Sequence, residues 1–214
     1  MRRRLALVLF LSVFAFGCAN PSAFRPAKTL GAGRFEHAFG LILSSPPSGE
    51  EGADESDLPG FGNGVPPFTP TYALRVGILD WLQIGGQVGY PFLRAEAQVH
   101  FFESTLLDLA VAGEVGYGPA PHRRIEAPDE DPFYALPFIA GLNLLPILSV
   151  VGHVGPARWD VTGWQYGGGI DLALPFVSLR PHVTVFDPFE TPKGERIRRG
   201  AHTVLGFDLA FRPF

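Results

Sequence analysis

The chain has 214 residues, a formal net charge of −4 and a sequence pI of about 5.8. This length suits one sizeable all-β domain, and the acidic balance argues against a nucleic-acid-binding protein, which needs a basic face. A single cysteine excludes an internal disulfide framework and a cysteine-rich zinc site. Abundant glycine and phenylalanine with few charged residues indicate many short strands joined by turns.

The N-terminus has the pattern of a secretory signal peptide. Three arginines follow Met1, and residues 5–16 form an apolar run broken only by Ser12. This run is too short to cross a bilayer as a helix, which takes about 20 residues, and it is typical of the apolar core of a signal peptide. The single cysteine, Cys18, stands directly after it.

The sequence Ala15-Phe16-Gly17-Cys18 resembles the lipobox of bacterial lipoproteins. The resemblance implies that Cys18 is acylated and becomes the first mature residue, and Ala19 after it favours sorting to the outer membrane. Ordinary signal peptidase would also accept Ala15 and Gly17. We therefore predict a signal peptide over residues 1–17, a lipidated N-terminus and linker over 18–32, and a β-barrel domain over 33–214.

Apolar and polar residues alternate along nearly every segment of the mature chain. Between Leu93 and Phe101, for example, every odd position is apolar, whereas the even positions hold arginine, glutamate, glutamine and histidine. Side chains of a strand alternate between two faces, so each face sees one environment. About ten segments follow this pattern: 33–43, 70–79, 82–90, 93–101, 106–117, 134–144, 147–154, 164–174, 177–186 and 202–211. Pro137 and Pro181 count against two of them, because proline cannot donate to a ladder.

The alternation fits both a soluble barrel with an apolar core and a transmembrane barrel with an apolar exterior. The spacing of the segments favours the second. Connections that fall on one side are tight, at 80–81, 102–105, 145–146 and 175–176. Most of those on the other side are long, at 44–69, 118–132, 155–163 and 187–201. This asymmetry is typical of outer-membrane barrels.

Two further features support the membrane interpretation. Amphipathic aromatic residues, which favour a membrane interface, fall at the strand ends on the side of the long connections: Tyr72, Tyr90, Tyr117, Tyr134, Trp164 and Tyr166. The polar face carries charges of both signs, which make a poor core for a soluble barrel. We predict that these residues line the lumen: Arg75, Arg94, Glu96, Asp108, Glu114, Asp171, Arg180 and Asp208.

With these features the chain resembles the bacterial outer-membrane β-barrels over about residues 33–214, and it ends in Phe214, as many of that class end in phenylalanine. The resemblance implies an all-β fold, an antiparallel up-and-down transmembrane β-barrel of about ten strands. It also implies an outer-membrane location with a periplasmic, lipid-anchored N-terminus. The expected partners are outer-membrane lipids, lipopolysaccharide and the barrel-assembly machinery.

The functional prediction is a structural, adhesive or narrow-channel role in the cell envelope, without enzymatic activity, cofactor or metal. One alternative is a periplasm-facing lipoprotein whose soluble, lipocalin-like barrel binds an apolar ligand. Another is a hydrolase at the barrel rim, since some outer-membrane proteases place acids and histidines there, and Asp160, Asp187 and His202 are rim candidates. Ser178 and His182 share a face but stand about 13 Å apart along a strand, too far for a nucleophile and its base.

Overall fold

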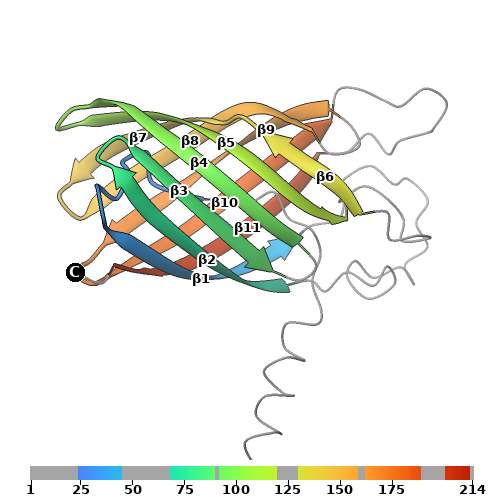
Figure 1. Cartoon of the computed structure of the whole chain (residues 1–214), viewed down its shortest axis with the longest axis horizontal. Helices are drawn as coiled ribbons and strands as arrows, with labels where there is room; N and C mark the ends of the chain where they lie inside the picture. The colour runs from blue at the N-terminus through green and yellow to red at the C-terminus, as the bar shows by residue number, and fades with distance from the viewer. Residues whose placement is uncertain are drawn as a thin grey trace, which may run out of the picture.

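The computed structural model describes residues 24–44, 68–89, 92–119, 130–158, 162–188 and 201–212. The regular elements in these ranges are strands (Figure 1). Their bounds are β1 (Phe35–Ser44), β2 (Phe68–Leu79), β3 (Leu82–Gly89), β4 (Phe92–Glu103), β5 (Leu107–Pro119), β6 (Glu130–Ala135), β7 (Phe138–Leu145), β8 (Leu148–Arg158), β9 (Thr162–Ala173), β10 (Val177–Pro188) and β11 (His202–Phe211). Within the described residues, no helix has the length and apolar character needed to cross a membrane.

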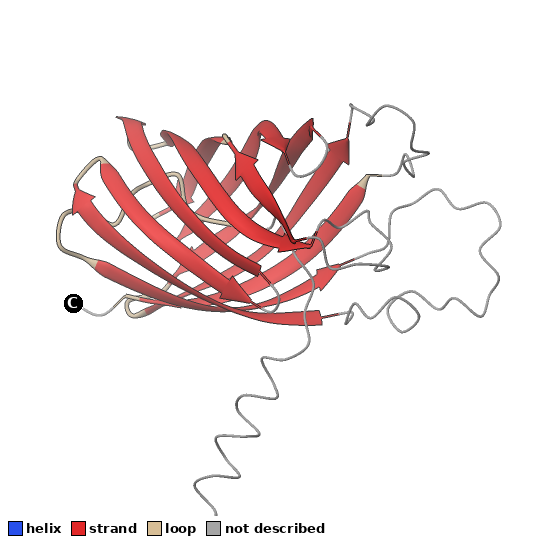
Figure 2. Cartoon of the chain, turned by 45° about the vertical axis from the view of Figure 1, so that its right-hand side comes forward, coloured by secondary structure: helices blue, strands red, loops and turns tan. Residues whose placement is uncertain are grey.

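The strands form one closed antiparallel barrel. Apart from β6 and β7, neighbours in sequence pair with each other. β1 pairs with β11 from His37 opposite Phe211 to Ser44 opposite Val204, which joins the two ends of the sheet. Figure 2 shows the tilted strands wrapped around the interior. The predicted all-β, up-and-down barrel is confirmed, and each of the ten expected segments contributes to it.

The eleven strands fill ten positions around the barrel because β6 and β7 share one position between β5 and β8. Residues Glu114–Pro119 of β5 pair with β6, and residues Leu107–Val111 of β5 pair with β7. Between them the Ala112 N–H donates to the Pro137 carbonyl at 2.9 Å. Pro137 has no N–H of its own, so the ladder is interrupted there. Pro181, in contrast, lies within β10 opposite Phe207 without a shift in register.

The two faces of the sheet have the opposite polarity to those of a soluble barrel. Large apolar side chains point outwards, and Phe39, Leu93 and Leu205 are each more than half exposed. Charged side chains are buried inside; the side chain of Arg180 is fully covered and Glu114 is 2% exposed. A soluble lipocalin-like barrel requires the reverse arrangement, so this outward apolar surface argues against that alternative and fits a surrounding of lipid.

The two ends of the barrel differ in their connections. Tight connections at 80–81, 104–106, 146–147 and 174–176 lie at one end, here called the turn end. The connections that leave from the other end, here called the loop end, include the long ones over residues 45–67, 120–129 and 189–201. Trp81, Phe102 and Phe176 are exposed at the turn end.

Candidate functional site: the filled lumen

A chain of alternating acids and bases crosses the interior of the barrel. It begins at Asp171 on β9, which accepts a hydrogen bond from Arg180 on β10 at 3.1 Å. Arg180 then binds Glu36 on β1 through two parallel N–H···O bonds of 2.7 Å. Paired N–H groups of arginine match the geometry of a carboxylate and give a strong, directional contact. These contacts tie β9 to β10 and, across the intervening β11, tie β10 to β1 on the inside of the sheet.

Glu36 is the centre of this chain. Besides Arg180, it accepts hydrogen bonds from Arg75 at 2.9 Å and from Arg212 at 2.9 Å, and its side chain is 1% exposed. Arg75 continues the chain to Glu96 on β4 at 2.7 Å. A carboxylate taken out of water needs such partners, because the charge is otherwise very costly to bury.

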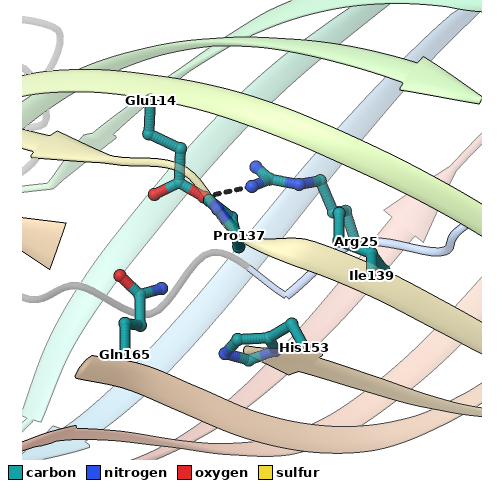
Figure 3. Close-up of a pocket in the computed structure, with 6 residues that line it drawn as sticks. All are labelled: Arg25, Glu114, Pro137, Ile139, His153 and Gln165. Atoms are coloured by element: carbon teal, nitrogen blue, oxygen red, sulfur yellow. Dashed lines mark hydrogen bonds and ion pairs between the residues drawn. The ribbon is translucent and has the colours of Figure 1, made fainter. Parts of the chain in front are cut away.

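The chain reaches β5 through a residue that does not belong to the barrel wall. Arg25, which is 2% exposed, donates from one terminal nitrogen to Glu96 and from the other to Glu114. Glu114 in turn faces Arg94 at 3.4 Å. Figure 3 shows Arg25 and Glu114 turned towards each other beside the break in the sheet at Pro137.

Arg25 belongs to residues 24–33, here called the strap. Its side chains at Phe24, Arg25, Ala27 and Thr29 are buried inside the barrel, whereas Lys28 is exposed. The Phe24 ring stacks on His182 with 5.2 Å between centroids. The Gln98 amide donates to the carbonyls of Pro26 and Ala27 at 2.9 and 2.8 Å. Residues 18–32 are interpreted as a linker from the sequence, whereas the described part of that range fills the lumen from its middle to the turn end (Figure 1).

The strap enters β1 through a glycine-rich turn that docks on β2. Gly31 and Gly33 have φ values of 83° and 74°, a region that favours glycine. The Gly33 N–H donates to the Gly77 carbonyl at 2.8 Å, and the Gly77 N–H donates to Arg34 at 2.9 Å. A Cβ on Gly77 would lie 1.8 Å from the Gly31 carbonyl oxygen, so the strap can dock here only against a glycine.

Replacing Gly77 with alanine should therefore displace the strap turn and lower the free energy of unfolding by about 1–3 kcal/mol, the usual cost of overpacking. Denaturant titration of the barrel in detergent measures this loss. Gly113→Ala on β5 is the matched control, because a Cβ there meets no atom within 4 Å and should change stability little. Equal losses in the two variants would show that strap docking does not contribute.

One side of the lumen at the turn end carries a second polar group. Asp108 accepts a hydrogen bond from the Asn143 amide at 2.8 Å, and Ser149 donates to Asn143 at 2.7 Å. His100 lies 3.7 Å from Asp108. These contacts join β4, β5, β7 and β8, so hydrogen-bonded side chains line this side of the turn end.

The loop end of the lumen is filled by apolar side chains instead. These residues are buried against one another: Ile42, Phe92, Phe133, Ala135, Ala157, Phe186 and Val204. They come from the loop ends of β1, β4, β6, β8, β10 and β11. Apolar constrictions lose their water, so we expect this layer to hinder the passage of ions and water. We call it the loop-end layer.

Space around Arg25 in the lumen is small. One interior pocket is lined by Arg25, Glu114, Pro137, Ile139, His153 and Gln165, and it leaves essentially no volume for a water-sized solute (Figure 3). Within the described residues, no group of three histidine, cysteine or acidic side chains is placed to hold a metal ion.

The structure places all eight residues predicted to line the lumen in the barrel interior, each no more than 8% exposed. Six of them form the alternating chain: Arg75, Arg94, Glu96, Glu114, Asp171 and Arg180. Asp108 belongs to the group at the turn end instead. Asp208 lies opposite Arg180 in the register, with one oxygen 4.0 Å from His182.

Two members of the chain are absent from the sequence prediction. Glu36 has the parity of an inward residue in its strand, and its place could have been found by reading the polar face of residues 33–43. Arg25 precedes the first strand in a stretch without periodicity, so the alternation gives no signal for it. Both are nevertheless among the most buried charged side chains, at 1% and 2% exposure.

The predicted interface aromatics lie on the outer surface of the barrel where they are described. Tyr117, Tyr134 and Trp164 are about half exposed near the loop end, and Tyr166 is 40% exposed. Tyr72 lies further from that end than expected, because β2 begins at Phe68, and its hydroxyl is 2.7 Å from His37 Nδ1.

Several predicted positions fall outside what the structure describes. Cys18, Tyr90, Asp160 and Phe214 lie outside the described residues, and so does the side chain of His202. Asp187 is exposed on β10. The acylation of Cys18 and the alternative of a rim hydrolase therefore stay predictions.

The comparisons with known proteins bear on the fold. No family model matches the chain, and no curated protein matches it. Among solved structures, an outer membrane channel from Pseudomonas putida F1 is similar with a TM-score of 0.53, at 8% identity, over 89% of this chain and 100% of that one. This chain has the fold of an outer-membrane β-barrel protein.

Two other similar structures are more distant. The NanC porin has a TM-score of 0.46 at 7% identity, covering 83% of this chain and 98% of that one. Ail, the attachment invasion locus protein of Yersinia pestis, has a TM-score of 0.33 at 12% identity, covering 85% of this chain and 99% of that one. The likeness of this chain to the Pseudomonas putida F1 structure concerns the fold alone.

Proposed function

We propose that this protein is an outer-membrane β-barrel lipoprotein whose lumen is closed at rest, with a structural or adhesive role in the cell envelope. The observation that carries the proposal is the filling of the lumen along its whole length. The loop-end layer, the alternating charges with Arg25, and the polar group around Asp108 follow one another from the loop end to the turn end. A barrel filled in this way offers no path for free diffusion.

The number of strands explains why a strap is needed. Eight strands enclose a space that wall side chains can fill, whereas about 16 leave a water-filled channel. A barrel with ten strand positions is slightly wider than an eight-stranded one, so the side chains of its wall alone leave a gap in the lumen. The strap supplies the missing volume with Phe24, Arg25 and Ala27, each at most 2% exposed.

A narrow channel is the second candidate, and the chemistry of the strap favours it. Many of the strap's contacts are hydrogen bonds to polar wall groups, which water can replace if the segment leaves. The similar protein from Pseudomonas putida F1 is called an outer membrane channel, and its likeness to this chain concerns the fold. A channel role for this chain requires displacement of the strap and of the loop-end layer.

The anchor and the partners belong to the same proposal. The signal-peptide pattern supports an acylated Cys18, insertion by the barrel-assembly machinery, and contact with lipid and lipopolysaccharide. From Gly33 back to Phe24, the strap runs from the turn end to the middle of the lumen.

Electrical recording tests the closed state directly. We expect the folded wild-type protein to insert into planar bilayers without producing conductance steps. The insertion itself can be checked by protease protection of the same protein in liposomes. A steady conductance from the wild-type barrel would contradict closure at rest and favour the channel.

A further inference from the structure

The wall of the barrel presents two carboxylates directly opposite each other. Glu96 on β4 and Glu114 on β5 are register partners, and both side chains point inwards and are buried. Like charges that face each other across two strands repel, and the repulsion is stronger away from water. This pair therefore needs a cation that contacts both carboxylates at once.

The wall arginines are shared among several acceptors. Arg75 contacts both Glu96 and Glu36. Arg94 contacts Glu114 at 3.4 Å and also attracts Glu96, while another of its nitrogens donates to Gln87. Counted along the alternating chain, Glu36, Glu96, Glu114 and Asp171 face three wall arginines, Arg75, Arg94 and Arg180. Arg212 contacts Glu36 and Asp171, at the far end from Glu114.

Arg25 supplies the hydrogen bonds that join the two carboxylates directly. Its two terminal nitrogens reach different carboxylates, one on each strand, an arrangement that suits a flat, forked cation. Arg25 Nε is buried and has no hydrogen-bond partner among the described residues. The two carboxylates therefore bind the terminal nitrogens of the guanidinium group, and they make no hydrogen bond to Nε, which joins that group to the rest of the Arg25 side chain.

We propose that Glu96 and Glu114 form a guanidinium-binding site in the barrel wall and that Arg25 is its tethered occupant. The site takes a small guanidinium compound or an arginine side chain when Arg25 is absent. An arginine within a peptide would fit the neighbouring contacts as well. Arg75 and Gln98 donate to backbone carbonyl groups of the strap, which any peptide offers.

Chemical rescue tests the site. Arg25→Ala should lower the ratio of folded to unfolded barrel by about tenfold or more, the expected loss for hydrogen bonds to charged groups. Millimolar methylguanidinium, far below denaturing concentrations, should restore most of this ratio. Tetramethylammonium and sodium chloride at the same ionic strength should not. The readout is the folded fraction on a gel after refolding into detergent, so it also works if the variant folds poorly without the cation.

A second substitution locates the rescue. In the Arg25→Ala background, Glu114→Gln should abolish the effect of methylguanidinium, whereas Glu103→Gln should preserve it, because Glu103 lies in an exposed pair with Lys28. Arg25→Lys should be destabilised as well, since an ammonium group cannot bridge both carboxylates as a fork does. The proposal would be overturned by rescue with any salt, by rescue that survives Glu114→Gln, or by an Arg25→Ala barrel as stable as the wild type.

Discussion

Replacement of Glu36 by leucine is expected to lower the free energy of unfolding of the barrel by about 3–5 kcal/mol, the loss found when one partner of a buried ion pair is removed. Glu36 accepts hydrogen bonds from Arg75, Arg180 and Arg212, and Arg180 has no exposed surface. Leucine leaves these guanidinium groups inside the lumen with one carboxylate fewer. Urea titration in detergent micelles, followed by tryptophan fluorescence, measures the effect.

The matched control is Glu103→Gln at the edge of the barrel. The Lys28–Glu103 pair has side chains that are 59% and 52% exposed, so its loss should cost at most about 1 kcal/mol. A Glu36→Leu barrel that unfolds at the same urea concentration as this control would show that the alternating chain does not stabilise the lumen. The arginines would then have to be hydrated in the folded state.

The second large effect concerns conductance, because the strap and the loop-end layer are two barriers in series. We expect a variant without residues 19–32 to remain closed, since the apolar layer still blocks the loop end. Phe92→Ala with Phe186→Ala should also remain closed, since the strap still fills the middle. The combined variant should give discrete conductance steps in planar bilayers, because both barriers are then reduced.

The comparison of the three variants makes this prediction sharp. Steps from the strapless variant alone would mean that the loop-end layer does not stop ions. If the combined variant gives no conductance steps although its gel mobility shows a folded barrel, the wall side chains close the lumen by themselves. That second result would remove the channel candidate and leave the structural or adhesive role.

Much of the fold follows from the sequence because a strand has the shortest possible side-chain period. Every second residue faces the same environment, so a run such as Leu93 to Phe101 determines both the presence of a strand and the inward side of Arg94 and Glu96. The break at Pro137 divides one predicted strand into β6 and β7, since proline removes the N–H that the ladder needs.

The contents of the lumen are less accessible to the same reasoning. Phe92, Phe133 and Phe186 are apolar and yet point inwards, which the rule of a polar interior does not anticipate. Their inward packing instead fits a need to exclude water from the lumen at the loop end. Arg25 and the strap have no periodicity at all, and their place is set by long-range contacts with Glu96, Glu114 and Gln98. Alternation predicts the wall of this barrel but not what fills it.

The most direct test of a membrane-inserted barrel uses the Cys18→Ser variant, which lacks the predicted acylation site. The protein is extracted from the membrane fraction in mild detergent and compared on a gel with and without boiling. We predict that the variant stays in the membrane fraction without its anchor and that boiling shifts its mobility, because the closed barrel resists detergent. Release of the variant into buffer, with no shift on boiling, would contradict the account and support a soluble barrel held only by its lipid.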